Sequence, residues 1–461
     1  MSGFRFNLTP RDVPKVNTKH RTIRTQIPVP ESLTVFDKLD RYESTAMHGQ
    51  MPVVWDRASD FQVFDAWGNC WIDFTSTIFV TNAGHANPRI LRAMRQVADK
   101  PLLHTYTYAS RERADYLEYL IANTPRQFEK AFFLSAGTEA TECALKLMRE
   151  RGALCDTRKK GVVCFEGNWH GRTLGAQMMG WNPAQKEWIG YLDPGIHHLA
   201  FPYPWRQEAM EDPAGYFERS MEALLQEKEL DPDRDLCGFM LETFQGWGAV
   251  FYPPAFVQAV ERFAREHGML MAFDEMQSGF GRTGKLFGYQ HYGVEPDILC
   301  CGKGAGSGVP LSIVLASSEI MDTFPIGSMS STHSANPLVC AVGKANLEAL
   351  LEDGLIESGA RLGDLFHQKL DALHGRFPEQ IGWIQGKGLV ASVIFTTRKG
   401  AVLPHLCDRI CELGMERGLL MVHTGRESIK LAPPLSISEE AMLEGLDVFE
   451  ECTAQAVKEL C

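Results

Sequence analysis

The stretch Met269-Leu270-Met271-Ala272-Phe273-Asp274 is an unbroken apolar run that ends in a carboxylate. A run of this length is typical of a strand that is buried on both faces, as in a parallel sheet. Ligands bind at the carboxyl ends of such strands, so Asp274 is expected to face a cleft. Residues 254–267 begin with proline, carry apolar residues at helical spacing and precede Gly268, which predicts a helix feeding this strand.

Four further apolar runs also end in polar or aromatic residues. They lead into Ser135-Ala136-Gly137-Thr138, into Gly167-Asn168-Trp169-His170-Gly171-Arg172, into Glu242, and into Gly302-Lys303-Gly304. The carboxyl ends of parallel strands meet at one edge of a sheet, so we expect five strands to bring these side chains together. The sequence therefore predicts an α/β fold with a mostly parallel sheet.

Lys303 follows one of these runs and opens a glycine-rich segment. A phosphate-binding P-loop has its lysine after the last glycine, and a dinucleotide fingerprint has another glycine spacing, so neither motif is present. An amine that is fixed at a strand exit suits covalent bonding to an aldehyde. A flexible turn with a solvated lysine is the alternative that the local sequence leaves open.

Three other strand ends have local alternatives as well. Gly137 and Thr138 begin a segment with helical spacing, which predicts an anion site at a helix N-terminus, but Thr138 also fits a plain helix cap. Asp274 fits a turn residue that caps the next segment. Trp169 fits a core tryptophan behind an apolar strand.

Composition limits the class of protein. The chain has 461 residues, 44% hydrophobic and 23% charged, which suffices for a large core and a second, smaller domain. The net charge of -12 disfavours a nucleic-acid partner, and no apolar run reaches a membrane-spanning length. No secretion signal is expected at Met1-Ser2-Gly3-Phe4-Arg5. The twelve cysteines include no CxxC pair, so we expect no metal site and reduced thiols in the cytoplasm.

These motifs together resemble the class III aminotransferases, pyridoxal 5′-phosphate (PLP) enzymes of fold type I. The matching segments are 273–284, 297–310, 332–338 and 386–389, with Asp73-Phe74, Gly84-His85-Ala86-Asn87-Pro88 and the segments at Ser135 and Trp169. They run in family order along most of the chain. The resemblance implies a large domain with a mostly parallel seven-stranded sheet flanked by helices, and a smaller α+β domain from the N- and C-terminal segments.

The resemblance also implies domain boundaries. They are 1–50 for an N-terminal arm, 51–85 for the N-terminal part of the small domain, 86–345 for the large PLP-binding domain and 346–461 for the C-terminal small domain. The arm is expected to order on a partner subunit or at the substrate entrance. Residues 383–395 predict a strand, and residues 440–460 predict a helix capped by Ser438.

Roles for single residues follow from the family match. Lys303 would form a covalent aldimine with the cofactor and carry the proton between substrate and cofactor, while Asp274 would pair with the pyridine nitrogen. Trp169 would stack on the ring. The full set of implied cofactor-binding residues is Gly137, Thr138, Trp169, His170, Glu242, Asp274, Gln277, Lys303 and Thr332. Thr332 would reach the partner's cofactor phosphate, so a homodimer or higher homo-oligomer with sites at the dimer interface is implied.

The implied substrates are a small-molecule amine donor and a carbonyl acceptor such as a keto acid, a semialdehyde or a sugar. Phe79, Glu242 and Lys430 are the implied substrate residues. Lys430 stands where the family usually has an arginine, and it offers a point charge without a bidentate fork. His423 or Arg426 would compensate, or else Lys430 faces solvent. Ala136 is a second departure, because serine is often found in that turn.

The predicted reaction is a ping-pong transfer of an amino group. An aminomutase or a decarboxylase on the same fold is the first alternative. A PLP-binding regulatory or scaffold protein without turnover is the second.

Overall fold

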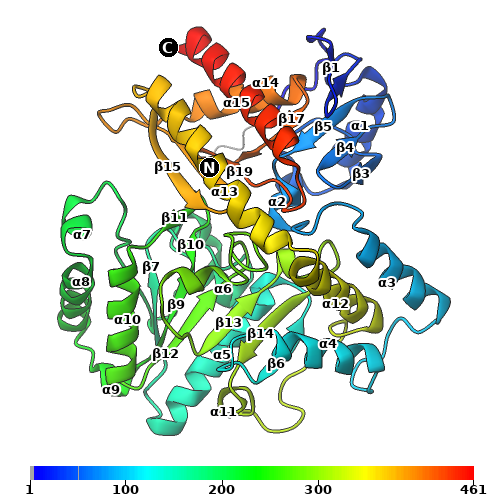
Figure 1. Cartoon of the computed structure of the whole chain (residues 1–461). Coiled ribbons are helices and arrows are strands. Elements are labelled where there is room, and N and C mark those ends of the chain that lie inside the picture. Colours follow the sequence, from blue (N-terminus) through cyan, green and yellow to red (C-terminus); the bar gives the residue numbers. More distant parts are fainter. Residues whose placement is uncertain (1–4, 50) are drawn as a thin grey trace. The chain divides into compact units, whose positions relative to one another are not determined.

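The computed structural model describes residues 5–49 and 51–461, which cluster into two compact units (Figure 1). Unit 1 is formed from Met1–Asn87, Trp247–Ala249 and Leu355–Cys461, and unit 2 from Pro88–Gly246 and Val250–Gly354.

Unit 2 is built on a seven-stranded sheet. In spatial order its strands are β6 (Lys130–Leu134), β14 (Ser312–Ala316), β13 (Ile298–Cys301), β12 (Leu270–Asp274), β9 (Leu236–Glu242), β7 (Gly161–Phe165) and β8 (Ile196–Leu199). Only β14 runs antiparallel to its neighbours. The predicted mostly parallel seven-stranded sheet is confirmed.

Helices cover both faces of this sheet (Figure 1). On one face, α5 (Gly137–Cys155) buries Ala144, Leu147 and Met148 against residues such as Met240 and Ala272. On the other, Phe239 contacts Phe217 of α8 (Pro213–Lys228) and Phe263 of α10 (Pro254–Glu266). Adjacent residues of one strand therefore face opposite helical layers, which requires the unbroken apolar runs seen in the sequence.

The remaining elements of unit 2 are shorter or lie at its edges. They are α3 (Pro88–Asp99), α4 (Arg111–Ala122), α6 (Leu174–Met179), η3 (Pro183–Gln185), η4 (Glu187–Ile189), α7 (Gln207–Glu211), α9 (Pro232–Asp235), β10 (Phe244–Gln245), β11 (Val250–Phe251), η5 (Gly288–His291), η6 (Lys303–Ala305), α11 (Ser318–Met321) and α12 (Pro337–Glu352).

Unit 1 contains two antiparallel-rich sheets. One comprises β1 (Val16–Asn17), β2 (Thr22–Ile23), β5 (Cys70–Asp73), β4 (Gln62–Phe64) and β3 (Arg57–Ser59), with β17 (Leu419–Leu420) beside β5, and the other comprises β15 (Ile381–Lys387), β16 (Val390–Phe395), β19 (Ser428–Leu431) and β18 (Val422–His423). The main helices are α1 (Leu33–Tyr42), α13 (Leu355–Arg376), α14 (Pro404–Glu416) and α15 (Glu439–Leu460). The short segments η1 (Pro30–Ser32), η2 (Thr45–Met47) and α2 (Ser76–Phe79) complete the unit.

One feature of unit 1 differs from the expectations. Residues 383–395 form a hairpin rather than one strand, because Gly388 adopts a φ of 58° between β15 and β16. The N-terminal arm supplies β1 and β2, and Thr22 pairs with Cys70 of β5, so these strands belong to the sheet of their own unit. The predicted helix at 440–460 is present as α15, and the Ser438 hydroxyl accepts from Ala441 N at 3.2 Å.

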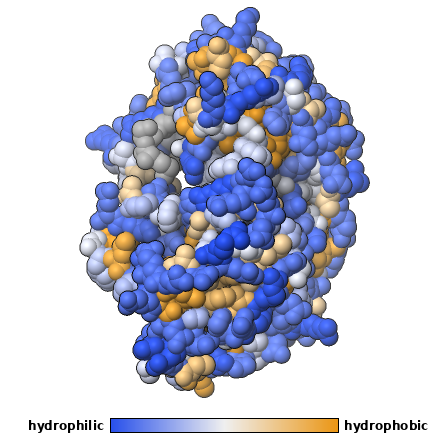
Figure 2. All heavy atoms as spheres, turned by 90° about the vertical axis from the view of Figure 1, so that its left-hand side faces the viewer, coloured by the Kyte–Doolittle hydropathy of each residue, from blue (hydrophilic) through white to orange (hydrophobic). Residues whose placement is uncertain are grey.

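The surface is mostly polar in the view of Figure 2, where hydrophobic residues gather in small separate groups. Among the helices that the structure describes, none has an apolar stretch long enough to span a membrane.

Candidate active site

The parallel register places three functional strand ends side by side. Asp274 at the end of β12 pairs with Glu242 at the end of β9 and with Cys300 of β13. Lys303 follows Cys300 by three residues. Both carboxylates are 5% exposed, so the two charges and the lysine share one buried edge of the sheet.

Asp274 is held by two hydrogen bonds. Its Oδ1 accepts from Met276 N at 3.0 Å, and its Oδ2 lies 2.9 Å from His170 Nδ1. Asn168 Nδ2 lies 2.7 Å from the other ring nitrogen of His170. An amide nitrogen only donates, so His170 Nε2 must be the acceptor. The ring proton is therefore on Nδ1, which donates a hydrogen bond to Asp274 Oδ2. The carboxylate is thereby fixed in place while remaining an acceptor.

Lys303 sits in a constrained backbone rather than a flexible loop. Its φ is 42°, a left-handed conformation that is uncommon for a residue with a Cβ and that clusters at functional sites. Asn346 of α12 donates from Nδ2 to the carbonyls of Gly304 and Ala305 at 2.8 and 3.0 Å. The lysine turn is therefore tied to a buried helix, which argues against the solvated-lysine alternative.

Burial lowers the pKa of the Lys303 amine, while the nearby charges of Asp274 and Glu242 raise it. Burial is the larger effect, because an ammonium group in a poorly hydrated site loses more hydration than the two carboxylates return. The amine is thus neutral at a lower pH than an ordinary lysine amine. A neutral amine is the form that attacks an aldehyde.

The turn after β6 forms the N-terminus of α5. Ala136, at the cap position, has no side-chain oxygen, and Glu139 reaches back to Ser135 N and Ala136 N at 2.8 and 3.0 Å. The first N–H groups of a helix have no partner within it, so Gly137 and Thr138 present donors toward an anion. The Thr138 hydroxyl lies 2.6 Å from that of Thr173.

Close approaches at glycines join these turns. A Cβ on Gly302 would lie 2.5 Å from Met276 Sδ, and one on Gly137 would lie 2.8 Å from the same sulfur. A Cβ on Gly171 would lie 2.3 Å from Thr138 Oγ1. The lysine turn, the α5 turn and the Trp169 turn therefore pack around one another, and any larger residue at these positions would separate them.

Trp169 and Glu242 are linked directly, since Trp169 N donates to Glu242 Oε2 at 2.9 Å. The indole ring is partly exposed and has the Arg172 guanidinium 4.6 Å from its centroid. A Cβ on Gly246 would lie 2.3 Å from Gln277 Nε2 and 2.8 Å from Glu242 Oε1, which places Gln277 in the same group. Thr332 is exposed, and His104 Nε2 lies 2.8 Å from its carbonyl oxygen.

Phe79 and Lys430 meet within unit 1. Lys430 is 5% exposed, and its Nζ lies 4.5 Å from the centroid of the Phe79 ring, which is 1% exposed. The alternative in which Lys430 faces solvent is therefore wrong. His423 instead pairs with Asp408 at 2.9 Å, and Arg426 lies over the Trp247 ring at 3.8 Å.

Several supporting residues were missed by sequence reasoning. They are Asn168 behind His170, Met276 between the turns, Asn346 below the lysine turn and His104 at Thr332. Asn168 lies next to Trp169 in the sequence, but its partner could not be inferred from that position. The other three act across more than 25 residues of sequence and left no local signal.

The donor set fits PLP. The phosphate needs N–H donors, which α5 provides, and the pyridine nitrogen needs a buried carboxylate, which Asp274 provides. The aldehyde needs an amine that loses its proton readily, and burial lowers the pKa of Lys303 in that direction. The flat ring needs an aromatic face, which Trp169 offers. All of these residues belong to unit 2.

Comparisons with known proteins identify the same chemistry. The family model "Aminotransferase class-III" matches residues 44–453. The chain is 34% identical to 2-aminoadipate transaminase of Pseudomonas putida over 88% of this chain and 96% of that protein. It is 32% identical to mitochondrial ornithine aminotransferase of Oryza sativa subsp. japonica over 90% and 84%. A thermostable (S)-enantioselective omega-transaminase from Thermomicrobium roseum superposes with a TM-score of 0.83 at 28% identity, covering 93% of this chain and 98% of that one.

The pKa of Lys303 gives a testable pH dependence. In the cofactor-free protein, reductive alkylation of Lys303 by propanal and cyanoborohydride should reach half its maximal rate below pH 10.5, the ordinary value for lysine. Replacement of Glu242 by Gln removes a charge that raises this pKa, so the midpoint should fall further. Mass spectrometry of the Lys303 peptide measures both.

Glu229→Gln, on an exposed turn, is the control and should leave the midpoint unchanged. A wild-type midpoint at or above 10.5, or a rise in Glu242→Gln, would contradict the stated balance of burial and charge.

Proposed function

The chain belongs to the class III aminotransferases, fold type I enzymes that depend on PLP, and from this premise we propose specific roles for its residues. The enzyme moves an amino group from an amine or amino-acid donor to a carbonyl acceptor. The observation that carries the residue assignment is the buried edge shared by Asp274, Glu242 and Lys303, where burial lowers the pKa of the lysine amine.

Lys303 is proposed to bond covalently to the cofactor and then to move the proton at the substrate's Cα. PLP, when bound, supplies an electron-accepting ring that stabilises the electron pair left after this proton is removed. Lys303 Nζ would take this proton in its neutral form, which the lowered pKa of the amine favours, and would return it later in the half-reaction. The Asp274 carboxylate holds a proton at the pyridine nitrogen, and His170 and Asn168 keep that carboxylate oriented.

The other proposed contacts position the cofactor. The N–H groups of Gly137 and Thr138 would bind its phosphate, and the Trp169 indole would stack on its pyridine ring. Gln277 and Glu242 would contact the substituents of the ring, and Trp169 N holds the Glu242 carboxylate in place. Two close carboxylates on a water-poor edge also favour the positively charged form of the ring.

A Lys303→Ala variant tests the assignment. It should retain noncovalently bound cofactor but lose at least ~10² in turnover, because proton transfer by one residue is typically worth ~10² to 10⁴. Addition of the amine donor should no longer convert the cofactor to its pyridoxamine form, which absorbance follows. Lys285→Ala, an exposed lysine of the same unit, should behave as wild type.

Product analysis on the wild type separates the alternatives. Transamination yields equal amounts of oxo product from the donor and amino product from the acceptor. An isomerised donor formed without any acceptor would instead indicate an aminomutase, and released CO₂ a decarboxylase. Full turnover in Lys303→Ala, or no donor-dependent spectral change in wild type, would contradict the proposal.

Lys430 is proposed to bind a substrate carboxylate, with Phe79 and Glu242 as the other substrate contacts. The support is its burial in unit 1, its single charge and the amino-acid names of the relatives, 2-aminoadipate and ornithine. Contact with the Phe79 face helps to hold the ammonium in place. A lysine lacks the planar fork of arginine, so carboxylates should bind in a less fixed orientation.

The test compares an amino-acid donor with the amine that lacks its carboxyl group, each followed by the donor half-reaction. Lys430→Met should lower kcat/KM for the amino acid by about tenfold or more, the size of one charge-assisted hydrogen bond. The simple amine should be affected little, and so should both donors in the exposed control Lys399→Met. Equal losses for both donors would contradict a carboxylate contact.

We further propose a homodimer in which Thr332 of each subunit binds the cofactor phosphate of the other. Thr332 is exposed in unit 2, and His104 and the Asn336 cap of α12 hold its loop in shape. The two units are proposed to be the large and small domains of the family. All twelve cysteines are free thiols and ten are buried, which supports the proposed cytoplasmic location.

Subunit mixing tests the shared site. Lys303→Ala homodimers should be inactive and Thr332→Ala homodimers should bind PLP weakly. A mixed dimer contains one intact site, because its wild-type Lys303 and wild-type Thr332 come from different chains. Refolding the two variants together should therefore restore tight-binding active sites in up to about half of the dimers, a statistical expectation for random pairing. Activity that never exceeds the sum of the two separate variants would contradict a site shared between subunits.

A further inference from the structure

A second cavity of unit 2 lies outside the catalytic edge. Its volume is about 410 Å³, within the range of roughly 300–1,000 Å³ typical of small-molecule sites. It is lined by Trp181, Pro183, Lys186, Glu187, Gly190, Tyr191, Leu192 and His198. These residues come from the segment that follows α6 and from β8, the last strand of the seven-stranded sheet.

Lys186 is the buried charge of this cavity. The residue is 9% exposed, and its Nζ donates to the Met178 carbonyl at 3.2 Å. Within residues 5–49 and 51–461 it forms no ion pair. A buried ammonium with one neutral acceptor is poorly compensated, because three N–H donors and a full charge have left water. Burial accordingly lowers its pKa.

The walls of the cavity are mainly apolar. Trp181, Tyr191 and Leu192 are 40%, 69% and 59% exposed, so a large hydrocarbon surface remains in contact with solvent. The Trp181 ring stands edge-on to the His198 ring at 5.5 Å. Burial lowers the pKa of His198 to about 4, so at neutral pH this ring is uncharged and its Nε2 bonds to the Met179 carbonyl at 2.9 Å.

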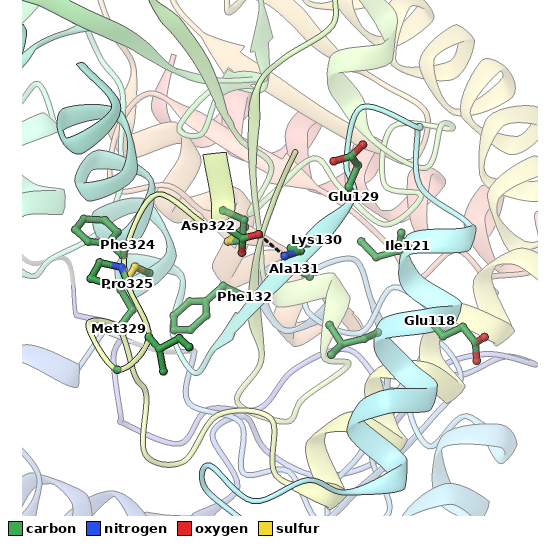
Figure 3. A pocket seen from close by; sticks show the side chains of 14 residues that line it. Glu118, Ile121, Glu129, Lys130, Ala131, Phe132, Asp322, Phe324, Pro325 and Met329 are labelled. Atoms are coloured by element: carbon green, nitrogen blue, oxygen red, sulfur yellow. Dashed lines mark hydrogen bonds and ion pairs between the residues drawn. The ribbon is translucent and has the colours of Figure 1, made fainter. Parts of the chain in front are cut away.

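Another cavity of the same unit shows what distinguishes this one. A groove of about 660 Å³ lies beside β6, between α4 and the segment 321–329, and is also largely apolar. In Figure 3 its lysine, Lys130, is joined to Asp322 across the groove. Its positive charge is therefore already neutralised, whereas that of Lys186 is not.

We propose that the cavity around Lys186 is a second ligand site, which takes a hydrophobic monocarboxylate such as an aromatic carboxylic acid. The carboxylate would bind to the Lys186 ammonium, and the hydrocarbon part would cover Trp181, Tyr191 and Leu192. The carboxylate would pair with a buried charge that has no ion-pair partner among the described residues. The hydrocarbon part would remove exposed apolar surface from water.

Glu187 limits the negative charge that a ligand of this cavity can carry. It lines the same cavity and is exposed, so a second anionic group on the ligand would meet its carboxylate. A dicarboxylate should therefore bind more weakly than a monocarboxylate of similar shape.

The competing explanation is purely structural. Met178 and Met179 end α6, so Lys186 and His198 satisfy carbonyl groups at a helix C-terminus. This role needs hydrogen-bond donors but no ligand. A Lys186→Gln variant keeps a donor and removes the charge, so it separates the two explanations.

The experiment uses the holoenzyme and calorimetric titration with 2-naphthoate, its neutral amide, and naphthalene-2,6-dicarboxylate. Wild type should bind 2-naphthoate at least about tenfold more tightly than the amide or the dicarboxylate. Lys186→Gln should lose this preference for the acid while keeping wild-type turnover. Lys159→Gln is the matched control, since Lys159 is 5% exposed and likewise bonds to one carbonyl, that of His267, but does not line this cavity.

Three results would overturn the proposal. They are unchanged 2-naphthoate affinity in Lys186→Gln, equal affinity for acid and amide in wild type, and loss of binding in Lys430→Gln, which would place the probe at the other lysine. If Lys186→Gln fails to fold, Tyr191→Ala serves instead. Loss of this exposed ring from the cavity wall should weaken the binding of the acid and of the amide by the same factor. Unchanged affinity in Tyr191→Ala would also count against the site.

Discussion

The parallel register of β9, β12 and β13 is the constraint on which the proposed catalytic edge depends. It sets Glu242, Asp274 and Cys300 side by side, so that two carboxylates and the turn bearing Lys303 emerge together. A shift of one residue in any of these strands would turn a functional side chain toward the opposite helical layer. The buried apolar faces on both sides prevent such a shift, because α5 and α10 each need their own set of residues from the same strands.

The same edge also influences the pKa of the Lys303 amine and keeps the Asp274 carboxylate oriented as an acceptor. Burial favours a neutral Lys303, and the neighbouring carboxylates limit how far its pKa falls. Asp274 stays available as an acceptor because each of its oxygens accepts one hydrogen bond, from His170 and from Met276 N, and a carboxylate oxygen can accept a second. Met276 then fills the space between the glycines of two turns, so the N-terminus of α5, where we propose that phosphate binds, stays close to the lysine turn.

Much of this could be predicted from the sequence, for a physical reason. Apolar runs ending in polar residues are a local signal, and the parallel sheet converts that signal into a shared edge. The contacts of Met276, Asn346 and His104 depend on partners that are distant in sequence, so they were not predictable in the same way. Gly388 has a φ that turns residues 383–395 into a hairpin, and pairing with β5 draws the N-terminal arm into its own unit. The burial of Lys430 against Phe79 also had no local signal, since a strand residue can face either side.

The central claim is that Lys303 is the residue that bonds to PLP. Borohydride reduction of the holoenzyme, followed by digestion and mass spectrometry, locates the reduced cofactor adduct directly. The account predicts one adduct per chain, on the peptide that contains Lys303. An adduct on another lysine, such as Lys186 or Lys430, or no adduct in a protein that carries its full complement of cofactor, would contradict it.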